Sequence, residues 1–179
     1  LWRYDTDTGT WVWMHGSSTR NQSGIYGSQG VPATTNTPGA RSEAMTWVDN
    51  NGGLWLFGGY VQDLFSSSEG RLSDLWRYDT DTGAWVWVQG SSSVNQSGVY
   101  GAQGVPNANN IPGARSGAAS WSDNAGKLWL SGGFGYDSAS KKGLLNDVWC
   151  YDPASGLWVW LKGSSTSGQL GAYGSQGLP

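Results

Sequence analysis

Hydrophobic residues fall in short runs separated by polar segments, and the same runs return along the chain. In one unit they cover 42–48, 54–58, 75–78 and 85–88, and each run is rich in Trp, Val, Leu or Tyr. Short runs of β-branched and aromatic residues bounded by Gly, Asn and Asp are typical of β-strands. We therefore predict four strands per unit, and nothing in the pattern predicts a helix.

Two of the connections between these strands are tight turns. DNNGG at 49–53 joins the first two predicted strands, and DTDTG at 79–83 joins the last two. Asn, Asp and Gly tolerate positive φ or cap their own backbone, so both segments predict β-hairpins. DTDTG also resembles the start of an acidic calcium loop, but the third copy, at 152–156, lacks the second carboxylate. We expect a turn there and no metal site.

The predicted strands belong to a long internal repeat. LWRYDTDTGTWVW at Leu1 returns 74 residues later at Leu75 as LWRYDTDTGAWVW, and 73 residues after that at Val148 as VWCYDPASGLWVW. All thirteen Trp fall on repeated positions, so recurring packing explains them better than a single catalytic pocket does. Those positions are Trp2, Trp11, Trp13, Trp47 and Trp55, together with their copies.

Four short antiparallel strands, a long loop and the same four strands again predict the blades of a β-propeller. The fold class expected is all-β, with about two and a half blades present. Residues 1–14 would be half a blade, 41–89 and 115–162 blades, and 15–40, 90–114 and 163–179 the inserts between blades. Closed propellers have about four to eight blades, so the remaining blades would come from the same polypeptide or from other copies of the chain.

The repeated residues resemble those of the kelch-repeat propellers, in a long-insert form related to the galactose oxidase group. The resemblance spans the whole chain and implies that the repeated residues hold the blades together. Kelch units usually have about 50 residues, and the additional length here lies in the inserts. The residues that carry the resemblance are Arg41 and Arg115, the pairs Gly58-Gly59 and Gly132-Gly133, Tyr78-Asp79 and Tyr151-Asp152, and Trp85 and Trp158.

Arg41 and Arg115 stand directly before the first strand of their units. We expect them to be structural, bridging backbone or carboxylate groups near the inner strand. The functional alternative is a ring of cations around the central channel, which would bind an anionic sugar or an acidic side chain.

The long connections should share one face of the blades, because strands that alternate in direction place alternate connections on opposite faces. Long loops on a rigid scaffold are where binding usually resides. The candidate binding residues on this face are Tyr60, Asp63, Phe65, Arg71, Phe134, Tyr136, Asp137 and Lys141, with Tyr26, Tyr100 and Tyr173 from the inserts.

Two kinds of long connection lie on that face. The inserts share NQSGxYGxQGVP almost unchanged, which suits a structural cover in which the tyrosines, with Ile25 and Val99, pack on a neighbouring blade. The connection between the second and third strands differs between copies, at 60–74 and 134–147. Such variation fits partner-specific contacts and also fits unconstrained loops.

Composition excludes several functions. Only 13% of residues are charged and the net charge is -3, whereas a nucleic-acid surface needs clustered positive charge. No apolar run approaches the roughly 20 residues that span a bilayer. A single Cys150 forms no internal disulfide, and His15 is the only histidine. The galactose oxidase resemblance would imply copper chemistry with two His and a Tyr crosslinked to Cys, so we expect no metal, no cofactor and no enzyme activity.

Three classes of function remain open. The first is a binding or adhesion module, extracellular or on the cell surface, whose partner is a protein or a glycan. The second is a structural protein whose blades assemble between chains into a ring or filament. The third is a propeller enzyme of the oxidase or sugar mutarotase type, completed by blades that are not in this sequence.

Overall fold

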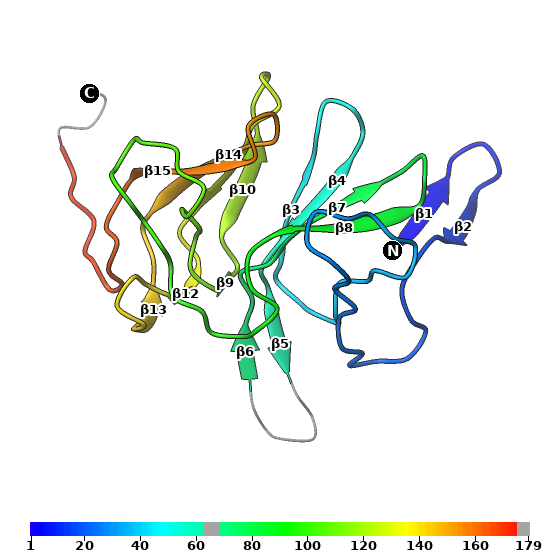
Figure 1. The fold of residues 1–179 in the computed structure, drawn as a ribbon, viewed down its shortest axis with the longest axis horizontal. Coiled ribbons are helices and arrows are strands. Elements are labelled where there is room, and N and C mark those ends of the chain that lie inside the picture. Colours follow the sequence, from blue (N-terminus) through cyan, green and yellow to red (C-terminus); the bar gives the residue numbers. More distant parts are fainter. Residues whose placement is uncertain (63–68, 175–179) are drawn as a thin grey trace.

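The structure is a computed structural model that describes residues 1–62 and 69–174 (Figure 1). All of the elements in these ranges are β-strands, and every pairing between them is antiparallel. Two four-stranded sheets form the blades. The first has the order β3 (Met45–Val48), β4 (Leu54–Phe57), β7 (Leu75–Asp79) and β8 (Ala84–Gln89), and the second has the order β10 (Ala119–Ser122), β11 (Leu128–Ser131), β14 (Val148–Asp152) and β15 (Leu157–Lys162).

Three smaller sheets complete the fold. The strands β1 (Trp2–Asp5) and β2 (Thr10–Trp13) pair as the outer half of a blade. The strands β5 (Tyr60–Gln62) and β6 (Glu69–Arg71) form a second pair. In the next unit β13 (Lys142–Leu144), β12 (Phe134–Tyr136) and β9 (Arg115–Ser116) form a three-stranded sheet in that order. The all-β fold with four-stranded blades therefore agrees with the prediction.

The inner strand β3 shows why the sequence folds this way. Met45 and Trp47 are buried, whereas the alternating Thr46 and Val48 are exposed, as the two-residue period of a strand requires. The following turn is held by Asp49, whose Oδ1 accepts hydrogen bonds from the backbone N–H of residues 51 and 53. Its Oδ2 accepts the indole N–H of Trp55 at 2.7 Å. The Asp49 carboxylate therefore holds both the 49–53 turn and the Trp55 side chain in place.

The DTDTG segment is a hairpin turn, as predicted. Asp79 Oδ1 accepts the backbone N–H of Asp81 and of Thr82, at 3.1 and 2.9 Å. Gly83 closes the turn with a φ of 68°, a conformation that favours glycine. The Asp79 carboxylate is therefore engaged by the backbone of its own turn.

The connection between the second and third strands was wrongly interpreted as a long loop. It forms the hairpin of β5 and β6 in one unit and that of β12 and β13 in the next. In the second unit the hairpin also pairs with β9, which lies just before the inner strand. This pairing was not evident from the sequence, because Gly and Ser are common in both segments and the third strand of the sheet is distant in sequence.

The inserts at 15–40 and 90–114 each cover the outer strand of the blade that follows. Gly30 N–H donates to the Trp87 carbonyl at 2.8 Å, and the Asn36 side chain donates to the Trp85 carbonyl at 3.0 Å. The predicted packing of Ile25 and Val99 is wrong, since these side chains are 57% and 47% exposed. The inserts are attached through backbone hydrogen bonds and through Asn and Tyr side chains, not through these apolar residues.

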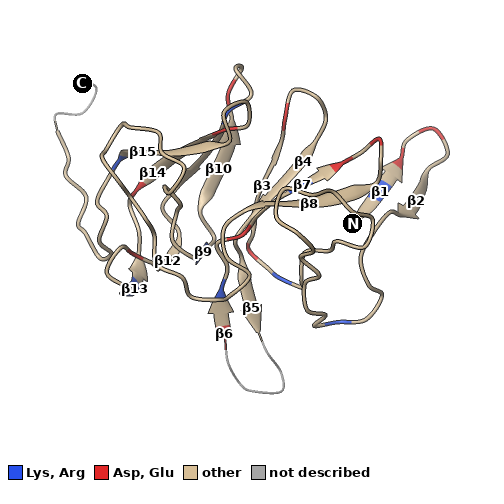
Figure 2. Ribbon diagram, viewed as in Figure 1, with Lys and Arg blue, Asp and Glu red and all other residues tan. Residues whose placement is uncertain are grey.

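The tight turns and the connections between the second and third strands lie on opposite sides of the blades, as predicted. In Figure 1 the tight turns of both blades point to one side, and the β5–β6 and β12–β13 hairpins point to the other. Figure 2 shows acidic residues at the tips of the tight turns and basic residues on β6 and β13. No helix in the described ranges is long and apolar enough to cross a membrane.

The core is continuous across the two blades. Trp55 packs against Tyr151 and Phe57 against Trp158, with ring centroids 5.5 Å apart in both pairs. Backbone bonds add to the contact, including Gly59 N–H to the Arg115 carbonyl at 2.9 Å. The tryptophans of the two blades are mostly buried, and those of β1 and β2 are exposed because no inner strands pack beside them.

Candidate functional site

A buried polar cluster occupies the same place in both units. In the second unit Arg115 donates to both carboxylate oxygens of Asp147, at 2.7 and 2.8 Å. Asp147 Oδ2 also accepts the Tyr100 hydroxyl at 2.6 Å and the Trp149 indole N–H at 2.7 Å. Arg115 further donates to the Gly132 carbonyl at 3.0 Å. These contacts join the insert, β9 and the segment that leads into β14 within one unit.

The electrostatics of this cluster follow from burial and pairing. Burial opposes ionisation of Asp147, but the Arg115 guanidinium and the hydrogen bonds from Tyr100 and Trp149 together keep the pKa of Asp147 below its ordinary value. Burial, and then the nearby Asp147 carboxylate, raise the pKa of Tyr100. Burial would lower the pKa of Arg115, but Asp147 raises it. The cluster therefore stays as an ion pair with a neutral tyrosine.

The first unit repeats the arrangement with Arg41, Asp74, Tyr26 and Trp76. Arg41 reaches the two oxygens of Asp74 at 2.7 and 2.9 Å, and Tyr26 donates to Asp74 at 2.7 Å. The arginines are structural, as predicted. The alternative of a cationic ring around the channel is wrong, because both guanidinium groups are nearly or fully buried against a carboxylate.

Sequence reasoning missed the aspartates of these clusters and the two insert asparagines that bind outer-strand carbonyls. Asp74 and Asp147 are 0% exposed, and Asn36 and Asn110 are 1% exposed. The sequence does indicate these residues, because the same aspartate and the same asparagine return at equivalent positions of successive units. An identical carboxylate one residue before a strand, in successive units, is typical of a buried partner for a repeated arginine.

The β5–β6 and β12–β13 hairpins lie side by side and form what we call the hairpin face. The Arg71 guanidinium carbon lies 4.6 Å from the Phe134 ring centroid and 5.4 Å from that of Tyr60. Lys142 Nζ lies 5.7 Å from the Phe134 centroid and 3.0 Å from Glu69 Oε1. The hairpin face is defined by Tyr60, Glu69, Arg71, Phe134 and Lys142.

Polar contacts hold this face in shape while leaving part of it open to solvent. The Tyr60 hydroxyl donates to Glu69 at 3.0 Å, and the hydrogen bonds from Lys142 and then Tyr60 lower the pKa of Glu69. The side chains of Glu69 and Lys142 are 53% and 37% exposed, and Phe134 is 36% exposed. Arg71 is almost buried between the rings.

Glu69 and Lys142 were also missed from the sequence. They occupy the same position in successive units and carry opposite charges. Because neighbouring hairpins meet, opposite charges at one repeat position indicate an ion pair between units. That signal becomes readable only once the connection is known to be a hairpin.

The other predicted binding residues divide into three groups. Tyr100 and Asp137 are buried and hydrogen-bonded within the protein, so their assignment to a binding surface is wrong; Asp137 accepts the backbone N–H of Ser167 at 2.8 Å. Tyr26 packs under its insert, whereas Tyr136 is half-buried and Lys141 and Tyr173 are exposed. Asp63 and Phe65 lie outside the described residues.

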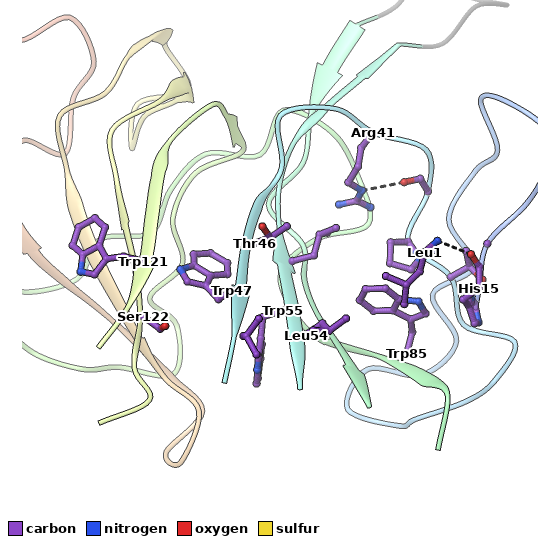
Figure 3. Close-up of a pocket in the computed structure, with 16 residues that line it drawn as sticks. Leu1, His15, Arg41, Thr46, Trp47, Leu54, Trp55, Trp85, Trp121 and Ser122 are labelled. Carbon is purple, nitrogen blue, oxygen red and sulfur yellow. Dashed lines mark hydrogen bonds between the residues drawn. The ribbon is translucent and has the colours of Figure 1, made fainter. Parts of the chain in front are cut away.

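An apolar groove of about 670 Å³ runs past the inner edge of β3 (Figure 3). Indole rings of Trp47, Trp55, Trp85 and Trp121 line it, with His15 at one end. Its lining comes from several repeat units, so the sequence alone did not indicate it. The His15 ring lies edge-on to Tyr78, with centroids 6.1 Å apart.

Comparison of the two blades explains why the groove is apolar. Leu128 and Leu130 in β11 are 0% exposed and belong to one buried cluster with Trp55 and Phe57 of the preceding blade. Leu54 and Leu56 hold the same positions in β4, are only half-buried and line the groove. In the second unit, the preceding blade packs against the face that contains Leu128 and Leu130. The groove is the corresponding face of the first blade.

Reactive groups are scarce in the described residues. They contain no cluster of three or more His, Cys, Asp or Glu placed to hold a metal ion. Cys150 is a buried free thiol in β14, and burial raises its pKa to about 11. A thiol with so high a pKa is a poor nucleophile at neutral pH.

Comparison with known proteins found one similar solved structure to report. No family model matches this chain, and no curated protein matches it. A solved structure titled "Structure of YjhT" is similar, with a TM-score of 0.49 and 17% sequence identity. The likeness, to a kelch-repeat propeller protein, covers 70% of this chain and 38% of that chain. This chain thus spans less than half the length of that protein.

Proposed function

We propose that this chain is part of a kelch-type propeller and acts as a non-enzymatic binding module whose ligand is a glycan held on the hairpin face. The observation that carries the proposal is the meeting of two hairpins from successive units, which sets Tyr60 and Phe134 on either side of Arg71. Rigid strands position these side chains, and sites on strands are more precise than sites on loops.

The chemistry of the face favours a sugar. Binding sites for small ligands combine aromatic surface with a few placed polar groups, and here a half-open Phe134 ring lies beside Lys142 and Glu69. A ring presents an apolar face that can lie against the C–H groups of a sugar, and the charged groups at its rim can bind hydroxyls. The proposed location, extracellular or on the cell surface, is where such a ligand is found.

A protein ligand is the second candidate. It is favoured by Leu144, which is 69% exposed at the end of β13 beside the same face. An exposed leucine next to an aromatic ring suits an apolar side chain of a partner better than it suits a sugar hydroxyl.

The test compares two aromatic truncations on different surfaces. The chain would be applied to immobilised neutral and acidic oligosaccharides as the parent, as Phe134→Ala and as Trp121→Ala, a control in the groove that is 44% exposed. We expect Phe134→Ala to weaken binding about tenfold or more, as loss of about 1.4 kcal/mol would, with Trp121→Ala unchanged.

Two results would contradict the proposal. If Trp121→Ala abolishes binding and Phe134→Ala does not, the ligand lies in the groove. If the parent binds none of the oligosaccharides, the glycan is the wrong ligand class, and the same pair of variants would then be tested against cell-surface protein extracts.

A further inference from the structure

Arg71 differs from the other arginines with buried side chains in lacking a carboxylate partner. Arg41 is paired with Asp74 and Arg115 with Asp147, each at 2.7 Å. Arg71 is only 9% exposed, and no carboxylate in the part of the chain that the structure describes forms an ion pair with it. Burying a charge without a counter-charge is costly, so this arginine needs an explanation.

The surroundings of Arg71 cover the faces of its guanidinium group but not its edge. The guanidinium carbon lies over the Tyr60 and Phe134 rings, and an aromatic ring attracts a cation through its π-face. The N–H groups of a guanidinium point outward in its own plane, where the faces of these rings offer no acceptor. Arg71 Nε is buried and has no hydrogen-bond partner. Buried N–H groups without an acceptor are rare in folded proteins, so this edge is available to bind one.

Glu69 lies on the same face of β6 as Arg71, but its carboxylate is engaged elsewhere. One of its oxygens accepts a hydrogen bond from Lys142 and the other from the Tyr60 hydroxyl, both at 3.0 Å. The five residues of the hairpin face therefore carry two positive charges and one negative charge. Because Glu69 pairs with Lys142, the positive charge left unmatched is that of Arg71.

Arg71 is also absent from the repeat pattern that holds the blades together. The segment 71–74 reads RLSD, and the corresponding segment 144–147 reads LLND. Leu144 ends β13 as Arg71 ends β6, so the hairpin forms without a cation at this position. Arg41 and Arg115, in contrast, return in both units with the same partners. The architecture of the blade thus does not account for Arg71.

We propose that Arg71 binds an oxyanion on the ligand of the hairpin face, either the carboxylate of a uronic acid or the sulfate group of a sulfated sugar. This inference rests on the glycan ligand proposed above and names its chemical class. The planar guanidinium fork matches two oxygens of a carboxylate or sulfate group. Lys142 adds positive charge beside the same aromatic ring, with its Nζ 5.7 Å from the Phe134 centroid.

A titration with inorganic sulfate tests the anion site without a sugar. The probe is the ¹⁵N–¹H signal of Arg71 Nε, assigned by its loss in Arg71→Leu. Sodium sulfate should shift this signal saturably, and sodium chloride at the same ionic strength, which screens charges equally, should not. A signal that responds to neither salt, or equally to both, would overturn the proposal.

Affinities for three oligosaccharides of equal length, one neutral, one of uronic acids and one sulfated, test the ligand class. The parent should bind at least one acidic sugar about tenfold or more tightly than the neutral one, because hydrogen bonds to charged groups are strong. Arg71→Leu, which introduces the residue of the second unit, should bind all three about equally. Lys162→Gln is the matched control, since it removes an exposed charge at the end of β15 and introduces the residue that ends β8. It should bind like the parent.

The outcomes separate this inference from the proposed function. If the parent binds neutral and acidic sugars equally and Phe134→Ala weakens both, the glycan ligand stands and the oxyanion site is overturned. If no oligosaccharide binds but sulfate still shifts the Arg71 signal, the oxyanion site stands and the glycan ligand is overturned. An Arg71→Leu variant that keeps the preference for acidic sugars would also overturn the inference. Tryptophan fluorescence of Arg71→Leu checks that the variant is folded.

Discussion

Arg115 and Asp147 lie 32 positions apart in sequence and form a two-point ion pair, with both side chains fully buried. Arg115 begins β9, which precedes the inner strand β10, and Asp147 is the residue directly before β14. Removing one member of a buried pair leaves the other charge unpaired, which costs much more than losing an exposed pair does. The stability of each blade should therefore depend on its own copy of this pair, Arg41–Asp74 in the first and Arg115–Asp147 in the second.

The first prediction concerns the Asp147→Asn variant. It should lower the free energy of unfolding by about 3 to 5 kcal/mol, because the Arg115 charge stays buried without a counter-charge. Urea unfolding followed by tryptophan fluorescence measures the loss. The control is Asp79→Asn, which removes a partly exposed pair with Arg77 but keeps a side-chain oxygen for the turn. It should cost less than about 1 kcal/mol, and equal losses in the two variants would contradict the argument.

The second prediction concerns acid. The folded pKa of Asp147 is lower than its ordinary value, so its contribution to stability is complete above that ordinary value and is lost as pH falls through the folded pKa. The free energy of unfolding should therefore drop below about pH 5. Measuring urea midpoints against pH in the parent and in Asp147→Asn should show a shallower drop in the variant. Parallel curves would assign the acid sensitivity to other carboxylates.

The third prediction concerns the attachment of the insert. Asn110 donates to the Trp158 and Val105 carbonyls at 3.1 and 3.0 Å, so Asn110→Ala removes two hydrogen bonds, one of them buried, and should cost about 1 to 3 kcal/mol. Hydrogen exchange should accelerate at the Gly104 amide, which bonds the Trp160 carbonyl. The exposed neighbour Asn109, changed to Ala, is the control and should leave that amide protected.

The fourth prediction concerns Cys150, the only cysteine. Because the thiol is buried and its pKa is raised to about 11, an aromatic disulfide reagent should not label the native protein at pH 7. Labelling should appear in step with urea unfolding followed by fluorescence. Rapid labelling of the native protein would mean that β14 opens locally.

The strands and tight turns were predictable because their signals are local. The alternation in 45–48 and the carboxylates of Asp49 and Asp79 act on residues within a few positions of themselves. The structural role of Arg115 was predictable from its repeated position, although its partner Asp147 was not identified. The hairpins at 60–71 and 134–144 were missed because their strands are short and their sequences resemble loops.

The sequence by itself determined the repeat, the all-β blades, the side on which each connection emerges and the recurring tryptophans, since period, turn chemistry and strand direction are written in neighbouring residues. Only the tertiary structure decided which side chains meet between units. The Glu69–Lys142 pair and the Arg71 contact with Phe134 join residues 73 and 63 positions apart, and their meeting depends on how adjacent blades pack. The tertiary structure also decided that Asp137 is buried and Lys141 exposed, because solvent exposure depends on how the blades pack.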